Sequence, residues 1–297
     1  MAAMYRSNER ALKIGAWLTG VYFIIELGLA VISGSIAVLS DAFHTFSAVG
    51  GVVLALIAGR IAARPADQYR TFGSFRAEIL GALFNGVFLL GMAGLVFYMG
   101  ILRLLNPMPV ESTFMIFAAI GGLVTESISL AFLYRGQKEN LNVRGAYWHV
   151  VQTFVGSILI IVAAVVIAFS GFLQIDPILG IGFGVVLVWA SVGIIRESTG
   201  LLMDAVPSDV DVLEVRETLD GIPGVTDVHH IHAWALTSGR NLFSAHIRID
   251  ETANNEAVLD QARKAVREQF GFYFSTLQVE KSCSYEEGAE EIDITGE

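Results

Sequence analysis

The chain has 297 residues, of which 54% are hydrophobic and only 16% are charged, and its mean hydropathy is +0.60. A soluble protein carries about 25% charged residues, so this composition indicates a membrane protein. The net charge of −10 argues against a nucleic-acid partner, and the single cysteine, Cys283, excludes an intramolecular disulfide framework. Residues 1–13 lack a small-residue cleavage site, so we expect no cleaved signal peptide.

Six apolar stretches are long enough to cross a bilayer, for which about 20 residues are needed. They lie at 11–33, 36–60, 78–104, 113–134, 145–171 and 177–198. Lysine and arginine gather before the first stretch and in the second and fourth connections, whereas the other connections are poor in both. The positive-inside rule therefore predicts an integral, multi-pass membrane protein with both termini in the cytoplasm, and we expect it in the cell (inner) membrane.

The composition changes near residue 205. The sequence beyond it predicts a helix, two strands, an amphipathic helix and a third strand, in that order. We therefore expect a transmembrane domain over 1–204, a cytoplasmic α+β domain over 205–285 and an acidic tail over 286–297. A layer of about 80 residues buries little core by itself, which favours pairing with a second copy.

Two histidines lie inside the apolar stretches: His44 in the second and His149 in the fifth. An ionisable side chain at bilayer depth is costly and commonly marks an ion or proton path. Neutral imidazole binds zinc and related metals, but two such ligands meet only if their helices pack together. The alternative is that each histidine bonds a carbonyl or hydroxyl group across a helix interface.

Acidic residues also lie at bilayer depth. Asp41 precedes His44 by three residues, so both lie near one face of a helix. Glu26 lies in the first stretch and Glu126 in the fourth. Asp41 and Glu126 join the two histidines as candidate ligands of a transmembrane cation site.

The predicted cytoplasmic domain holds the other histidines. His229, His230 and His232 lie on its first strand, and His246 lies on the second. Strand alternation predicts that His230 and His232 share one face and that His229 points to the other. The alternative to a metal site is a set of ordinary surface histidines. The chain contains no GxxxxGK[ST], GxGxxG or GxSxG motif, so we do not expect an enzyme.

Several segments together resemble one known family. They are SGSIAVLSDAFHTFSAVGG at 33–51, RPADQYRTFGSFRAEILGALFNG at 64–86, ENLNVRGAYWHVVQTFVGS at 139–157 and IPGVTDVHHIHAWALTSG at 222–239. They are similar to the cation diffusion facilitator family, in its zinc-transporter-like branch. The resemblance implies six transmembrane helices, a cytoplasmic ferredoxin-like metal-binding domain, a homodimer, and export of zinc or a similar divalent cation against protons.

The resemblance also implies a transport site built from two HxxxD motifs. The histidines correspond to His44 and His149, but Ala48 and Thr153 stand where the family has aspartates. Two imidazoles alone would leave a buried divalent charge with half of its ligands. Glu126, where the family commonly has asparagine, is the candidate for the missing carboxylate.

In the cytoplasmic domain the resemblance implies zinc ligands at His229, His246 and Glu280, and His230 stands where aspartate is usual. The connection between the second and third stretches carries a metal-binding histidine set in some members, of which only Asp67 remains here.

Three hypotheses follow from the sequence. The favoured one is a proton-coupled divalent-cation efflux transporter with altered ligands at its transport site. It would lie in membrane lipid and need no cofactor. The divalent cation would be both the transported substrate and a regulatory ligand. The second is a transport-incompetent member that acts as a metal-binding or heteromeric partner. The third, a membrane protein that conducts protons or a small solute, applies only if the resemblance misleads.

Overall fold

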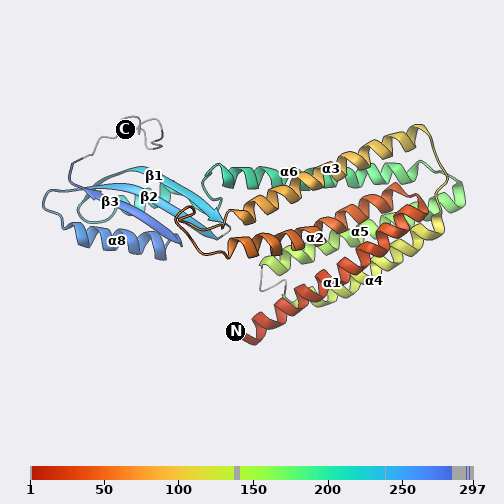
Figure 1. Ribbon diagram of the computed structural model, residues 1–297, viewed down its shortest axis with the longest axis horizontal. Helices are drawn as coiled ribbons and strands as arrows, with labels where there is room; N and C mark the ends of the chain where they lie inside the picture. Colours follow the sequence, from red (N-terminus) through yellow and green to blue (C-terminus); the bar gives the residue numbers. More distant parts are fainter. Residues whose placement is uncertain (1, 137–140, 238, 283–291, 293, 295–297) are drawn as a thin grey trace. The chain divides into compact units, whose positions relative to one another are not determined.

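The computed structural model describes the backbone of residues 2–136, 141–237, 239–282, 292 and 294 (Figure 1). Side chains are described over the same ranges apart from residues 2–16, 18, 47–49, 51–53, 55–56, 135–136, 141–146 and 148–149. Most of the predicted acidic tail, and Cys283, lie outside these ranges. The chain forms two compact units, one of Met1–Ile57 with Gly81–Ile195 and one of Ala58–Leu80 with Arg196–Glu297.

Six long helices correspond to the six predicted apolar stretches. They are α1 (Ala2–Ser33), α2 (Ile36–Ala62), α3 (Ala77–Leu105), α4 (Ser112–Gly136), α5 (Leu141–Ser170) and α6 (Ile175–Leu202). By length and composition, four described segments can cross a membrane: Ala77–Leu105, Ser112–Tyr134, Val150–Ser170 and Ile175–Leu202. The described apolar parts of α1 and α2 are shorter, at Thr19–Ser33 and Ile36–Phe46.

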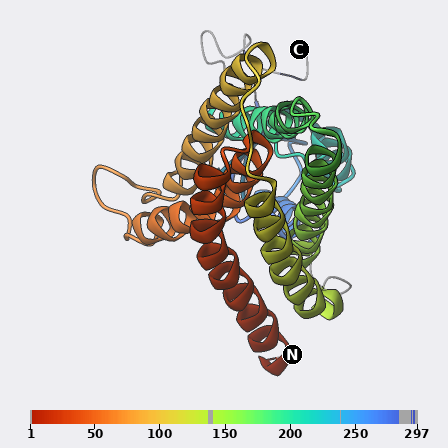
Figure 2. The same ribbon diagram turned by 90° about the vertical axis from the view of Figure 1, so that its right-hand side faces the viewer.

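The helices of the first unit bury small apolar side chains against one another. One cluster joins α1, α2, α4 and α5, and a second joins α2, α3 and α6. Figure 2 shows α1 running beside α4, and α4 beside α5. Large apolar side chains point outward: Ile24, Phe169 and Trp189 are 70%, 89% and 75% exposed. Such a surface is suited to lipid, because the hydrocarbon is as apolar as the side chains.

The start of α2 is fixed by a residue from another helix. Asp176, in the first turn of α6, is fully buried and accepts hydrogen bonds from the Ile36 and Ala37 amides at 2.8 and 3.2 Å. It also accepts one from the hydroxyl of Ser35, which itself accepts from the Val38 amide at 3.0 Å. These contacts satisfy amide groups that a helix N-terminus leaves without intrahelical partners.

The second unit contains the sheet domain, in the helix–strand–strand–helix–strand order expected from the sequence. The elements are α7 (Val212–Asp220), β1 (Val225–Thr237), β2 (Arg240–Ile249), α8 (Asn255–Glu268) and β3 (Phe274–Glu280). Strand β2 lies between β1, to which it is antiparallel, and β3, to which it is parallel. Apolar residues of the sheet pack with those of α7 and α8 in one core, and the histidines lie on the opposite face of the sheet.

Candidate metal sites

Three carboxyl groups meet inside the first unit. Glu26 of α1, Asp41 of α2 and Glu126 of α4 are 1%, 4% and 8% exposed. The Glu26 carboxyl lies within hydrogen-bonding reach of Asp41 and of the Thr45 hydroxyl, and Glu126 is near enough to interact electrostatically with Asp41. Three helices therefore bring carboxyl groups close together in one buried region.

Glycines allow the helices around these groups to approach closely. A methyl group added at Gly122 of α4 would lie 2.5 Å from Ser157 Oγ of α5 and 3.1 Å from the Tyr22 hydroxyl of α1. One added at Gly156 of α5 would lie 3.2 Å from Asp41 Oδ1. The absence of a side chain at these two positions is therefore part of how α1, α2, α4 and α5 come together.

Glu126 reaches the position where the resemblance places an aspartate. Its carboxylate accepts a hydrogen bond from Ser157 Oγ at 3.2 Å and lies within reach of the Thr153 hydroxyl. Thr153 is buried, and its hydroxyl also donates to the Val150 carbonyl at 2.9 Å. The carboxylate that α5 lacks at residue 153 is thus matched by one that α4 directs toward the same place.

Of the two intramembrane histidines, the structure describes the side chain of His44 but only the backbone of His149. His44 is half-buried on α2, about one turn beyond Asp41. His149 lies in α5, but its side chain is outside the described residues, as is that of Ala48. The convergence of His44 and His149 therefore stays a prediction. Sequence reasoning did not assign Glu26 to the site, although an acid within an apolar stretch was the signal that would have found it.

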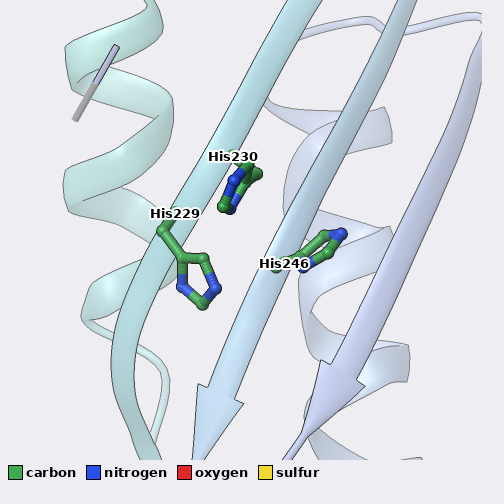
Figure 3. A group of neighbouring side chains, drawn as sticks. All are labelled: His229, His230 and His246. Atoms are coloured by element: carbon green, nitrogen blue, oxygen red, sulfur yellow. The ribbon is translucent and has the colours of Figure 1, made fainter. Parts of the chain in front are cut away.

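A second cluster lies on the sheet of the other unit. His229, His230 and His246 each offer a ring nitrogen, and these atoms all lie within 4.8 Å of one another (Figure 3). His229 and His246 are opposite each other on β1 and β2. His232 lies opposite Ser244, two residues along β2 from His246, and is not a member of this cluster as the structure describes it.

The predicted alternation of the β1 histidines was wrong at one position. The β1–β2 register shifts between His229 and His232, and His230 has a φ of +49°. This bulge, with a left-handed residue inside it, lets His229 and His230 lie together, with ring centroids 5.2 Å apart. Ile231 returns to the core beyond the bulge. A non-glycine residue with positive φ is uncommon, and such backbone outliers gather at functional sites.

Charged neighbours orient His229 within the cluster. Asp227 Oδ2 lies 2.9 Å from His229 Nδ1 and 3.3 Å from Arg248 Nη2. When His229 donates its Nδ1 hydrogen to Asp227, its Nε2 is left as a metal ligand, which is a common arrangement at zinc sites. That Nε2 lies 3.4 Å from Glu280 Oε1.

Glu280 lies beside two of the three histidines, His229 and His246. Its Oε1 is also 4.0 Å from His246 Nδ1, while its Oε2 accepts a hydrogen bond from Gln278 Nε2 at 2.9 Å. Ligands about 2.0–2.1 Å from a tetrahedral zinc ion lie roughly 3.3 Å from one another, so the Glu280–His229 separation suits a shared ion, whereas ring nitrogens as much as 4.8 Å apart would move closer around it. Three imidazoles, with a carboxylate beside two of them, are the donor types that bind a zinc-like ion.

The connection between α2 and α3 is organised by Asp67, the residue that the resemblance relates to a histidine-containing loop in some members of the family. Its Oδ1 accepts hydrogen bonds from the amides of Tyr69 and Arg70, both at 2.8 Å. The Asp67 carboxylate therefore stabilises a local turn, and this structural role accounts for an aspartate at this position.

Comparison with known proteins identifies relatives of nearly the whole chain. The family of cation efflux transmembrane domains matches residues 12–203, and that of cation efflux protein cytoplasmic domains matches 207–282. The chain is 37% identical over 290 residues to the cation efflux system protein CzcD of Alcaligenes sp. (strain CT14), covering 97% of this chain and 92% of that protein.

Two further relatives carry more specific names. The cadmium, cobalt and zinc/H(+)-K(+) antiporter of Bacillus subtilis (strain 168) is 32% identical over 288 residues, covering 95% of this chain and 92% of that protein. The zinc transporter ZitB of Escherichia coli (strain K12) is 30% identical over 276 residues, covering 92% and 88% respectively.

Proposed function

The chain belongs to the cation diffusion facilitator family, in its zinc-transporter-like branch, and from this premise we propose that it exports zinc or a similar divalent cation from the cytoplasm in exchange for protons. The names of its relatives, which include metal efflux proteins, an antiporter and a zinc transporter, support both the cargo and the exchange. Those relatives are transporters, so the proposal includes no catalysis and no organic cofactor.

The proposed arrangement is a multi-pass protein of the inner membrane. All of α1–α6 cross the bilayer, both termini lie in the cytoplasm, and the ferredoxin-like C-terminal domain pairs with that of a second copy. The apolar outward-facing helices and the bacterial relatives support the membrane location. The distribution of lysine and arginine supports the orientation.

One observation carries the transport proposal: the Glu126 carboxylate lies beside Thr153 and interacts with Asp41. In the proposed site, His44, His149, Asp41 and Glu126 hold the cation. The imidazoles supply nitrogen ligands, while the carboxylates supply the negative charge that Ala48 and Thr153 lack. Both kinds of ligand are needed, because a divalent ion in a low-dielectric interior must be neutralised as well as coordinated.

The cytoplasmic cluster has a separate role in this proposal. His229, His230, His246 and Glu280 bind a regulatory metal ion on the sheet, and Asp227 orients His229. The grouping of three ring nitrogens, with the Glu280 carboxylate beside His229 and His246, supports this assignment. Metal bound here would report cytoplasmic metal concentration to the rest of the chain.

A second candidate function rests on the substitutions themselves. Ala48 and Thr153 remove both aspartates of the family's transport motif, which favours a member that binds metal without moving it. Such a protein would still bind zinc in its cytoplasmic domain and would act as a partner of an active transporter.

Flux through the purified full chain in proteoliposomes distinguishes the two functions. We expect saturable zinc uptake driven by a proton gradient, and a decrease of at least about 10-fold when His44→Ala and His149→Ala are combined. His232→Ala is the matched histidine control and should retain wild-type flux. Zinc binding to the wild type without any flux would support the second function, and undiminished flux in the double variant would refute histidine ligation.

A further inference from the structure

We propose that Glu26 is a third carboxylate ligand of the transmembrane cation site, so that Glu26, Asp41 and Glu126 form an oxygen-rich set that accepts harder divalent cations such as Mn²⁺. This inference rests on the proposed function, because it concerns the same transport site. It adds α1 to the helices that hold the cargo.

The three carboxyl groups lie near one another and near the Tyr22 hydroxyl. Tyr22, one turn before Glu26 on α1, interacts electrostatically with Glu26, Asp41 and Glu126 together. Its hydroxyl donates a hydrogen bond to the Ala118 carbonyl of α4, which fixes the ring between the two helices. Glu26 itself lies within hydrogen-bonding reach of Asp41. Glu26 and Asp41 are therefore neighbours, and Glu126 lies near enough to interact electrostatically with both.

No lysine or arginine that the structure describes on these helices neutralises the carboxyl groups. Residues 14–33 of α1, 36–59 of α2, 112–134 of α4 and 145–170 of α5 contain no lysine or arginine. Among the described side chains, none of the three carboxyls forms an ion pair with either residue type. Uncompensated carboxylates at this depth are costly, and a divalent cation would offset most of their charge.

Two of the carboxyl oxygen atoms have no hydrogen-bond partner among the described residues. Glu26 Oε2 and Glu126 Oε2 are buried, and neither has a hydrogen-bond partner in the described part of the chain. Both side chains are more than nine-tenths buried; Glu26 lies within hydrogen-bonding reach of Asp41, and Glu126 interacts with it electrostatically. A buried polar atom without a partner calls for an explanation such as an ion. Two such oxygens, each from a different helix and both near a third carboxyl group, support a cation site here.

The donor type sets the class of cation. Carboxylate and hydroxyl oxygens suit Mn²⁺, whereas thiolates select softer ions. The chain has a single cysteine, Cys283, outside the transmembrane helices. The Thr45 hydroxyl beside Glu26 adds a further oxygen to the same location. We therefore expect Mn²⁺ to bind this site alongside zinc-like ions.

Binding of Mn²⁺ to the purified full chain, followed by electron paramagnetic resonance of the free ion, tests the inference without any transport. The cytoplasmic cluster is first disabled with His229→Ala and His246→Ala, so that the membrane site is measured alone. In this background, Glu26→Gln should weaken Mn²⁺ binding by at least about 10-fold, as should Glu126→Gln. Glu111→Gln, the same chemical change at an exposed residue, should leave binding unchanged.

Thermal unfolding separates a ligand from a structural residue. If Glu26 is a ligand, the metal-free Glu26→Gln protein should melt no lower than its background, and Mn²⁺ should no longer raise its melting temperature. Full Mn²⁺ affinity in Glu26→Gln would overturn the inference, as would a background protein that binds no Mn²⁺. Neither result depends on flux, so a chain that binds Mn²⁺ through Glu26 but moves no metal would overturn only the proposed function.

Discussion

At the scale of single residues, the proposed transport site depends on Glu126 of α4, whose carboxyl group lies beside Thr153 of α5. The resemblance implies an acid at residue 153 of α5, and in this chain the Glu126 carboxyl group of α4 lies within hydrogen-bonding reach of the Thr153 hydroxyl. In the proposed site, α4 thus supplies the carboxylate that the resemblance implies for α5. Sequence alone identified Glu126 as the candidate, and the packing of α4 on α5 places its carboxyl group beside Thr153 and Ser157.

Asp227 illustrates a residue that acts through another. It lies 2.9 Å from His229 Nδ1 and sets which nitrogen of that ring can bind metal. We expect Asp227→Asn to weaken zinc binding to the cytoplasmic cluster by about 10- to 100-fold, the usual effect of removing such a partner. Zinc titration of the full chain with Glu26→Gln and Glu126→Gln in the background measures the effect. Unchanged affinity would show that the ring is oriented by other contacts.

Asp220, at the end of α7, gives a pH-dependent prediction. Burial raises the pKa of its carboxyl above the ordinary value, the negative charge of Asp227 adds to the increase, and Arg216 opposes it. Because the folded state holds this proton more tightly than the unfolded state, the stabilising contribution is present below the unfolded pKa and is lost as pH rises through the folded one.

Asp220→Asn should therefore be slightly more stable than the wild type at pH 7, by on the order of 0.5 kcal/mol, because the side chain is partly exposed and screened. The difference should shrink as the pH falls through the ordinary range of an aspartate, near about 4, because the wild-type carboxyl then takes up a proton. Thermal melts of both proteins at the two pH values provide the measurement, and a variant that is less stable at pH 7 would contradict the account.

At the scale of elements, the cap on α2 and the bulge in β1 are features that sequence patterns did not reveal. Apolar runs located the helices, because bilayer crossing demands about 20 such residues. They carried no information on Asp176, which caps a helix about 140 residues earlier in the chain. Alternation located β1, but a bulge changes the face of a side chain and depends on the neighbouring strand. His230 is an example, because it lies where the pairing register between β1 and β2 shifts.

Removal of the cap should destabilise the first unit. Asp176→Ala leaves the Ile36 and Ala37 amides and the Ser35 hydroxyl without their acceptor, at a cost of about 2 kcal/mol. Asp176→Asn keeps one acceptor oxygen and should lose less. The unfolding of both variants in detergent, compared with the wild type, tests the ranking; equal stability of the alanine variant would refute the role of the cap.

At the scale of the whole molecule, the sequence predicted two kinds of structure from two kinds of pattern. The long apolar stretches correspond to helices α1–α6. The shorter helical and alternating patterns beyond residue 205 predicted the order α7, β1, β2, α8, β3 that the structure has. The candidate sites were predicted in part: Asp41 and Glu126 converge, and so do His229, His230, His246 and Glu280. Glu26 was missed as a ligand, because its role depends on which face of α1 meets α2 and α4, and periodicity in an apolar helix does not identify that face.

The two proposed metal sites lie in different compact units, so each should bind its ion without the other. This separation is what allows the transmembrane site to be measured in a protein whose sheet cluster is disabled. It also means that zinc binding by the full chain is not by itself evidence of transport.

The central claim is that the Glu126 carboxylate replaces the acid missing at residue 153. Zinc flux through proteoliposomes containing Glu126→Asn, alone and combined with Thr153→Asp, tests it most directly. We predict that the single variant loses at least about 10-fold of the wild-type flux, as expected for loss of a charged ligand, and that the double variant recovers most of it. A double variant that folds to the wild-type yield but transports no better than Glu126→Asn, or a single variant with full flux, would contradict the claim.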